Sequence, residues 1–149
     1  MERPPRKFED LVVGEERISD WRTISEEEIV RFAREYDPQW FHADPEAAKA
    51  SSFGGVIASG VQNFAIWRQL DHTINSDIDY ICGVGFDNYR MKTALRPGDR
   101  VRVRSKVLEL TPSTSRDDRG TAVIECILEN DRGETILRFD SINLVHRRT

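Results

Sequence analysis

The sequence predicts a single α+β domain, residues 1–149, in which one buried helix lies against an antiparallel sheet. Residues 58–74 read as a long helix whose first half is apolar on nearly every side, as in a helix surrounded by other structure. Four long strand-like segments then follow with short connections, which favours antiparallel pairing. A chain of 149 residues corresponds to about one domain, and no linker or internal repeat divides it.

Composition and charge restrict the class of protein before any motif is considered. Hydrophobic residues make up 38% and charged residues 32% of the chain, which is ordinary for a soluble globular protein. The formal net charge of -4 argues against nucleic acid as a partner. No run approaches the ~18 apolar residues of a membrane-spanning helix, and the start MERPPRKF has no apolar run behind its charges. We therefore expect a cytoplasmic protein with no membrane partner.

The first helix is predicted from its two ends. Residues 16–23 fit an extended edge segment, and Ser25 and Glu28 then have the S-x-x-E spacing of a capping box. Apolar residues recur on one helical face at Ile29, Phe32, Ala33 and Tyr36. Pro38 lacks a backbone N–H and disfavours helical geometry in the residue before it, so the helix should end near Asp37.

Asp37 and His42 are the candidate chemical pair. Five residues apart, they would lie on different faces of a continuous helix, but a short loop, PQWFH, is expected between them. This loop can turn the carboxylate and the imidazole toward one water and so create a general acid–base unit. Asp44 and Pro45 have the residue types of a helix start, so Asp44 is assigned to N-capping rather than to catalysis.

Neither a metal site nor a disulfide is expected. His42 and Asp44 lack a third convergent ligand at suitable spacing, which argues against a metal. Cys82 and Cys126 lie in strand-like segments without CxxC spacing. Buried free thiols in a reducing compartment are therefore favoured over a disulfide.

The second half of the chain reads as consecutive strands. Residues 80–92 are rich in aromatic and β-branched side chains, and between Val101 and Val107 apolar and basic residues alternate with a period of two. Two further strands are expected at residues 121–129 and 134–146, with polar turns at 96–100, 116–120 and 130–133. The expected order is helices, one buried helix and an antiparallel meander.

The stretch YDPQWFHADPEAA resembles the motif of the MaoC-like dehydratases, a hot-dog-fold family that includes the (R)-specific enoyl-CoA hydratases. The family motif runs Asp, any residue, Asn, Pro, any residue, His, and an Asp-Pro helix start commonly follows. Asp37 and His42 keep this spacing, whereas Gln39 and Trp40 stand where Asn and Pro are usual. The resemblance continues through FGGVIASG and DNYRMKTALRPGDRV and so covers most of the chain.

The resemblance implies a fold, a reaction and partners. The implied fold is the hot dog, in which an antiparallel sheet wraps around a long central helix. The implied reaction adds water to, or removes it from, the double bond of a trans-2-enoyl thioester of CoA or acyl carrier protein, without a cofactor. The implied assembly is a homodimer or a dimer of dimers with the site near the subunit interface, which would also cover exposed edge strands.

The resemblance also assigns roles to residues. Asp37 and His42 are expected to be catalytic, and the backbone N–H of Gly60 is expected to bind the thioester carbonyl at a helix N-terminus. The indole of Trp40 is expected to shape the acyl pocket. Further substrate-contacting candidates, some of which would alternatively bond only to the sheet, are Gln39, Gln62 and Asn63.

Two other functions stay open. A hot-dog thioesterase would keep the fold and the thioester substrate, but water would attack the carbonyl group; the intact pair Asp37 and His42 argues against it. A non-catalytic, acyl-thioester-binding subunit is the other alternative, and the departures at Gln39 and Trp40 are the reason to consider it.

Overall fold

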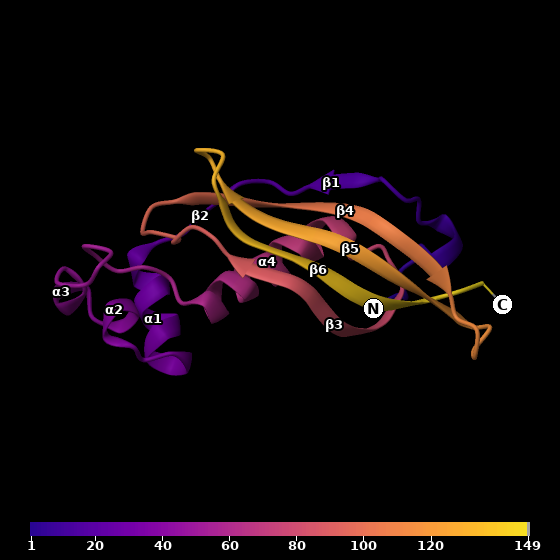
Figure 1. The fold of residues 1–149 in the computed structure, drawn as a ribbon, viewed down its shortest axis with the longest axis horizontal. Helices are drawn as coiled ribbons and strands as arrows, with labels where there is room; N and C mark the ends of the chain where they lie inside the picture. Colours follow the sequence, from indigo (N-terminus) through magenta and orange to yellow (C-terminus); the bar gives the residue numbers. More distant parts are fainter. Residues whose placement is uncertain (149) are drawn as a thin grey trace.

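The computed structural model describes residues 1–148 and has the α+β architecture expected from the sequence. One long helix lies against one side of an antiparallel sheet, and three shorter helices form a lobe beyond one end of the sheet (Figure 1). The elements in chain order are η1 (Phe8–Asp10), β1 (Glu16–Ile18), β2 (Arg22–Thr23), α1 (Glu26–Tyr36), α2 (Trp40–Ala43), α3 (Pro45–Ala48), α4 (Gly60–Asn75), β3 (Tyr80–Met91), β4 (Arg100–Pro112), β5 (Arg119–Asn130) and β6 (Thr135–His146).

The observed strand order differs from the meander that the sequence predicted. The sheet runs β1-β4-β5-β6-β3, with β2 also paired to β4, so β3 pairs with β6 and not with its successor β4. The segment between β3 and β4 does not turn back as a hairpin because its Leu95 is fully buried. The Leu95 carbonyl accepts a hydrogen bond from the N–H of Ala58 at 2.9 Å, which holds this segment beside the start of α4. β3 is consequently an edge strand.

Helix α4 packs one face on the core, and its bounds differ by two residues or fewer from those expected. The expectation that its first half is buried on nearly every side is wrong, because Val61 is 58% exposed and Ala65 is also exposed. Ser59 caps its start, where its Oγ accepts a hydrogen bond from the N–H of Val61 at 3.1 Å. Trp67 is buried and packs edge-on against the fully buried ring of Phe139 on β6, with 4.6 Å between ring centroids. The aromatic contact fixes the helix on the sheet over the strands that follow it.

Helix α1 begins as the sequence predicts, but its buried face is different. The Ser25 Oγ accepts a hydrogen bond from the N–H of Glu28 at 3.2 Å, which confirms the N-cap. Ile29 and Ala33 are fully buried, whereas Tyr36 is 63% exposed. The Tyr36 ring packs on Phe32 with 5.0 Å between centroids, so it belongs to the outer side of the last turn and not to the core.

The cysteines are both free thiols, and one of the two expectations about their burial is wrong. Cys126 is buried on β5, and burial raises the pKa of its thiol to about 12. Cys82 is exposed because β3 is an edge strand. Within residues 1–148, no group of three or more His, Cys, Asp and Glu side chains is arranged to hold a metal ion. None of the helices described combines the length and the apolar composition needed to span a bilayer.

Candidate active site

Asp37 lies at the C-terminal end of α1, where the helix stops. Its backbone leaves helical geometry at φ -151° and ψ 74°, and its N–H still donates to the carbonyl of Ala33 at 2.8 Å. Pro38 follows and cannot continue the helix. A carboxylate gains no stabilisation from the negative end of a helix dipole. The position of Asp37 therefore favours a role other than helix stabilisation.

His42 lies in the single helical turn α2, at a place where the sequence suggested only a loop. The turn forms because the carbonyl of Gln39 accepts hydrogen bonds from the N–H groups of His42 and Ala43, both at 2.9 Å. The His42 side chain is buried, and its Nδ1 lies 2.6 Å from the carbonyl oxygen of Ile57. Because a carbonyl can only accept, Nδ1 carries the proton, and the lone pair of the neutral ring lies on Nε2.

The two candidate groups face each other across a gap. The His42 Nε2 lies 3.7 Å from the Asp37 Oδ2. This distance is too long for a direct hydrogen bond. A water between them would donate one hydrogen to each acceptor, which is the arrangement that polar contacts beyond about 3.5 Å call for. The structure thus brings together the carboxylate and the imidazole, as the sequence predicted, at a spacing that suits a bridging water.

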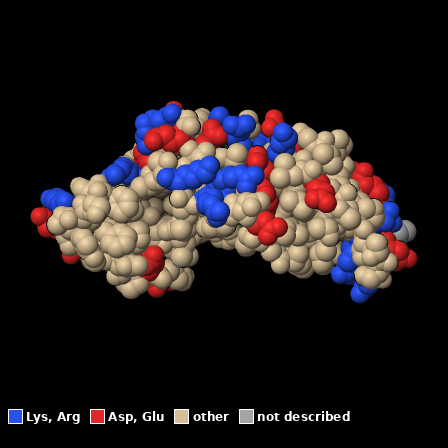
Figure 2. Space-filling model, in the orientation of Figure 1, with Lys and Arg blue, Asp and Glu red and all other residues tan. Residues whose placement is uncertain are grey.

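Asp37 opens onto a cavity at the start of α4. The cavity has a volume of about 480 Å³ and is lined by Asp37, Gly60, Val61, Phe64, Phe86, Tyr89 and Met91. Figure 2 shows the surface hollowed between the lobe of short helices and the sheet, near the start of α4. Apart from Asp37, the lining residues are apolar or aromatic. We call this space the outer cavity.

Gly60 is the first residue of α4 and part of the outer cavity wall. The first N–H groups of a helix have no partner within it, so they can bind an electronegative atom. A Cβ atom at residue 60 would overlap the sulfur of Met91. A larger residue here would require the exposed Met91 side chain to move, whereas glycine leaves the backbone open to a ligand.

Two of the expected substrate contacts lie beside the pair but do not line the outer cavity. Gln39 caps α2 through its backbone carbonyl. Trp40 is half exposed and packs edge-on against Phe41, with 5.6 Å between ring centroids. The structure gives neither side chain a contact with the outer cavity, so their roles in substrate binding stay predictions.

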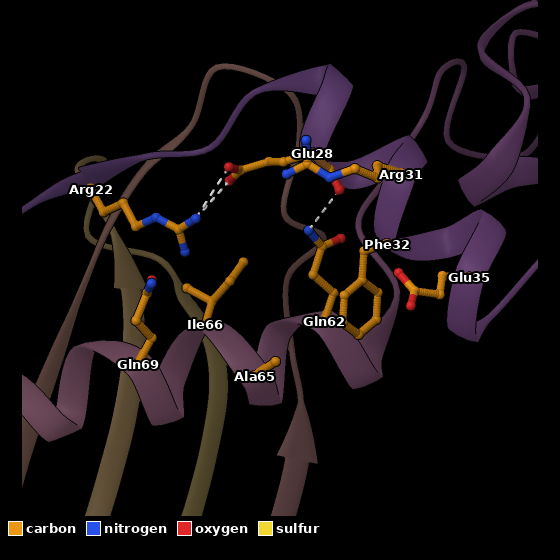
Figure 3. A pocket seen from close by; sticks show the side chains of 9 residues that line it. All are labelled: Arg22, Glu28, Arg31, Phe32, Glu35, Gln62, Ala65, Ile66 and Gln69. Atoms are coloured by element: carbon orange, nitrogen blue, oxygen red, sulfur yellow. Dashed lines mark hydrogen bonds and ion pairs between the residues drawn. The ribbon is translucent and has the colours of Figure 1, made fainter.

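Gln62 lies on another side of α4. It borders a separate cavity of about 250 Å³ between α1 and α4, shown in Figure 3. Its Nε2 donates to the carbonyl of Glu28 at 3.3 Å, and its Oε1 is buried without a partner. The neighbouring Asn63 is also buried, and its Oδ1 has no partner. Gln62 thus connects the two helices, while Asn63 is placed in neither cavity.

Sequence reasoning missed the aromatic side of the outer cavity. Phe64 lies one helical turn after Gly60 and faces the same way, and Phe86, Tyr89 and Met91 come from β3. The helical spacing from Gly60 to Phe64 was a usable signal. The position of β3 beside this face of α4 could not be predicted, because it depends on the strand order of the whole sheet.

The chain is similar to known proteins in both sequence and fold. A sequence model of a protein family, described as MaoC like domain, matches residues 9–127. The chain belongs to the MaoC-like dehydratase family. The match includes Asp37, His42 and Gly60 and extends through most of the sheet.

MaoC-like relatives match both the sequence and the fold. The 3-hydroxyacyl-thioester dehydratase Z of Mycobacterium tuberculosis is 32% identical over 125 residues, which cover 75% of this chain and 83% of the relative. The crystal structure of the MaoC-like dehydratase from Rhodospirillum rubrum has 38% sequence identity and a TM-score of 0.90, covering 97% of this chain and 99% of the other. The (R)-hydratase from A. caviae, at 20% identity and a TM-score of 0.72 over 89% and 96% of the chains, shares the fold. The hot-dog fold predicted from the sequence is therefore confirmed.

Proposed function

We propose that this MaoC-like protein adds water to the double bond of a trans-2-enoyl thioester and, in reverse, dehydrates the 3-hydroxyacyl thioester. The observation that carries this proposal is the separation of 3.7 Å between Asp37 Oδ2 and His42 Nε2 beside the N-terminus of α4. A pair that holds one water suits hydration better than a direct ion pair would. The similarity to a 3-hydroxyacyl-thioester dehydratase supports the same class of reaction.

The proposed reaction uses one water. Asp37 and His42 hold the water, and its oxygen attacks C3 of the enoyl group while His42 Nε2 accepts a proton from it. The electrons of the double bond move toward the thioester carbonyl and form an enolate. The imidazolium then returns its proton to C2, so that H and OH have been added across the double bond. The Asp37 carboxylate stabilises the imidazolium in between.

The enolate oxygen is proposed to bind at the start of α4. The free N–H of Gly60 and the positive end of the helix dipole both favour negative charge at this place. The apolar walls around it lower the local dielectric constant and so strengthen this interaction. The acyl group would extend from the carbonyl into the outer cavity, past Val61 and Phe64.

The test is an assay of the purified protein with trans-2-enoyl-CoA thioesters of graded length. Hydration removes the conjugated double bond, so it is followed by the loss of its ultraviolet absorbance. Release of free thiol is measured in the same samples. Loss of absorbance without thiol release supports the proposal. Thiol release alone would indicate a thioesterase, and no turnover by the protein alone would indicate a non-catalytic subunit.

A further inference from the structure

A second cavity lies between α4 and the sheet, farther along the helix than the outer cavity. It has a volume of about 220 Å³ and includes Phe64, Arg68, Asp71, Tyr80, Phe86 and Asn143 in its wall. We call it the inner cavity. Its residues come from α4, β3, β5 and β6, and none of the catalytic candidates is among them.

The two cavities are neighbours in line along α4. Phe64 and Phe86 belong to the walls of both, and their rings meet edge to face with 5.1 Å between centroids. From Gly60 to Asp71 the helix rises about 16 Å, at 1.5 Å per residue. An acyl chain that starts with its carbonyl at Gly60 and follows this helix therefore reaches the inner cavity once it passes the two phenylalanine rings.

The wall of the inner cavity is mostly apolar but includes several polar side chains, namely Arg68, Asp71, Tyr80, Ser141 and Asn143. Asp71 is only 4% exposed, and its Oδ1 accepts a hydrogen bond from Asn75 Nδ2 at 2.8 Å. Its Oδ2 lies 3.2 Å from the guanidinium of Arg68. Burial raises the pKa of Asp71 despite these partners. The carboxylate is thus held in a site of low polarity, where a further hydrogen-bond donor would stabilise it.

Free hydrogen-bonding capacity remains on the other side of the inner cavity. Tyr80 lines it and is partly buried, and no hydrogen bond joins its hydroxyl to another of residues 1–148. Asn143 uses its Nδ2 to donate to Ser141 Oγ at 2.9 Å. Its Oδ1 faces β3, 3.7 Å from where a Cβ atom of residue 83 would be. A donor and an acceptor therefore border the same small space.

These groups should bind some terminal groups of an acyl chain more tightly than others. A plain alkyl end would cover Tyr80 and Asn143, which are both partly buried, and would leave their free polar atoms without partners, which costs free energy once water is excluded. A carboxylate would approach Asp71, whose carboxyl group is already paired with Arg68, and the two carboxyl groups would have to share that one cation. A hydroxyl both donates and accepts, so it can satisfy Tyr80 and Asn143 together.

The geometry points to an acyl thioester that carries a hydroxyl group far from the thioester, with that hydroxyl bound in the inner cavity. This inference rests on the proposed function, because it takes Gly60 as the place of the thioester carbonyl. Phe64 and Phe86 mark the boundary that the chain must pass. Tyr80 and Asn143 are the residues that determine specificity.

The test uses saturated acyl-CoA compounds, which bind but cannot be hydrated, so that binding is measured whether or not the protein is a hydratase. Calorimetry gives the dissociation constants of dodecanoyl-CoA, whose chain is long enough to reach the inner cavity from Gly60, and of its ω-hydroxy and ω-carboxy derivatives of similar length. The hydroxy compound should bind about tenfold more tightly than dodecanoyl-CoA, as expected for one or two neutral hydrogen bonds. The carboxy compound should bind more weakly than the hydroxy compound.

Variants identify the residue responsible. Tyr80→Phe should reduce the preference for the hydroxy compound to about threefold or less, since one of the two partners is lost. Tyr36→Phe, which removes the same hydroxyl from an exposed position outside both cavities, should leave the preference unchanged. Equal binding of all three compounds, tightest binding of the carboxy compound, or a full preference in Tyr80→Phe would each overturn the inference. Failure of the hydration assay alone would overturn only the proposed reaction.

Discussion

At the scale of single residues, the candidate site depends on which hydrogen-bond donors already have a partner within the protein. The Nδ1–H of His42 is bound to Ile57, so only Nε2 is free to exchange a proton at the gap. Ser59 Oγ takes the N–H of Val61, which leaves the N–H of Gly60 as a free donor at the helix start. Each atom of the proposed chemistry is thus left free by a hydrogen bond that a neighbouring group makes.

The first prediction concerns the proposed pair. Asp37→Asn and His42→Ala should each lower kcat on a short enoyl thioester by about 10²-fold or more, because the first removes the charge that stabilises the imidazolium and the second removes the general acid–base group. Asp37→Asn should leave the melting temperature nearly unchanged. His42→Ala should lower stability by about 1–3 kcal/mol, because it leaves the buried carbonyl of Ile57 without a donor.

Matched controls for these changes lie on the surface. His72→Ala and Asp117→Asn alter exposed side chains outside the outer cavity and should retain wild-type kcat. Near-wild-type turnover by Asp37→Asn, measured on a protein whose circular dichroism is native, would remove the carboxylate from the mechanism.

The second prediction concerns the start of α4. Gly60→Val should depress turnover on every thioester tested, because its side chain would occupy the space of the Met91 sulfur and crowd the carbonyl. Gly55→Val places the same side chain where nothing lies within 4 Å and should have little effect. Chain-length profiles of kcat for both variants make the comparison. Full activity of Gly60→Val would show that the thioester carbonyl binds elsewhere.

At the scale of secondary-structure elements, the sequence predicted what local rules determine. The N-cap at Ser25, the helix stop at Pro38 and the cap at Asp44 follow from backbone donors and acceptors, and all three are found. The turn α2 was not predicted, because four residues are too few to show a helical period. Trp40 is its first residue, a position at which proline is also favoured. The usual family proline and this tryptophan are therefore compatible with the same backbone.

The third prediction concerns α4 and its buried carboxylate. Burial raises the pKa of Asp71 above its ordinary value of 3.8, so the folded state binds the proton more tightly than the unfolded state. Its contribution to stability is fully present below pH 3.8 and is lost as the pH rises through the higher pKa of the folded protein. Asp71→Asn, which stays neutral, should thus be more stable than wild type near neutral pH.

Urea unfolding at several pH values measures how the stability difference between Asp71→Asn and wild type depends on pH. The stability advantage of Asp71→Asn should shrink as the pH falls toward 3.8. Asp117→Asn, at an exposed position, should show no such dependence. A variant less stable than wild type at neutral pH would mean that the ion pair with Arg68 outweighs the cost of burial.

At the scale of the whole molecule, β3 is a long strand that forms one edge of the sheet. It pairs with β6 on one side only, and Figure 1 shows it at the margin of the sheet. Exposed apolar side chains gather on it and at the adjacent start of α4, namely Val84, Phe86, Met91 and Val61. Such an edge, if left uncovered, is prone to non-specific pairing.

The fourth prediction is therefore a homodimer formed through β3. Light scattering after gel filtration at micromolar concentration should give twice the monomer mass. Val84→Lys should shift the protein toward the monomer and lower its activity, because Phe86 and Met91 of the outer cavity lie on the same strand. Val13→Lys, at an exposed apolar residue near the N-terminus, is the control. A monomeric wild-type protein would contradict the prediction.

The limits of sequence reasoning also appear at this scale. The strand segments were found because their alternation is local, but the place of β3 beside β6 was not, since it depends on how residues 92–99 pass the end of the sheet. The pair Asp37 and His42 could be found because both residues lie in one short motif. The contact between Phe64 and Phe86 could not be predicted, because the strand order of the sheet brings these two residues together.

The hydrogen bond from His42 to Ile57 has a mechanical consequence. Ile57 lies three residues before Gly60, so the imidazole is fastened to the same short segment that leads into α4. A displacement of that segment would carry the His42 imidazole and the backbone N–H of Gly60, the groups proposed to transfer the proton and to bind the carbonyl, in the same direction. The reacting ends of a substrate would then keep their alignment while the distant wall on β3 changes. The part of the site that holds the thioester would then stay constant while the wall of the acyl cavity varies. Related proteins could in this way differ in acyl preference and keep the same reaction.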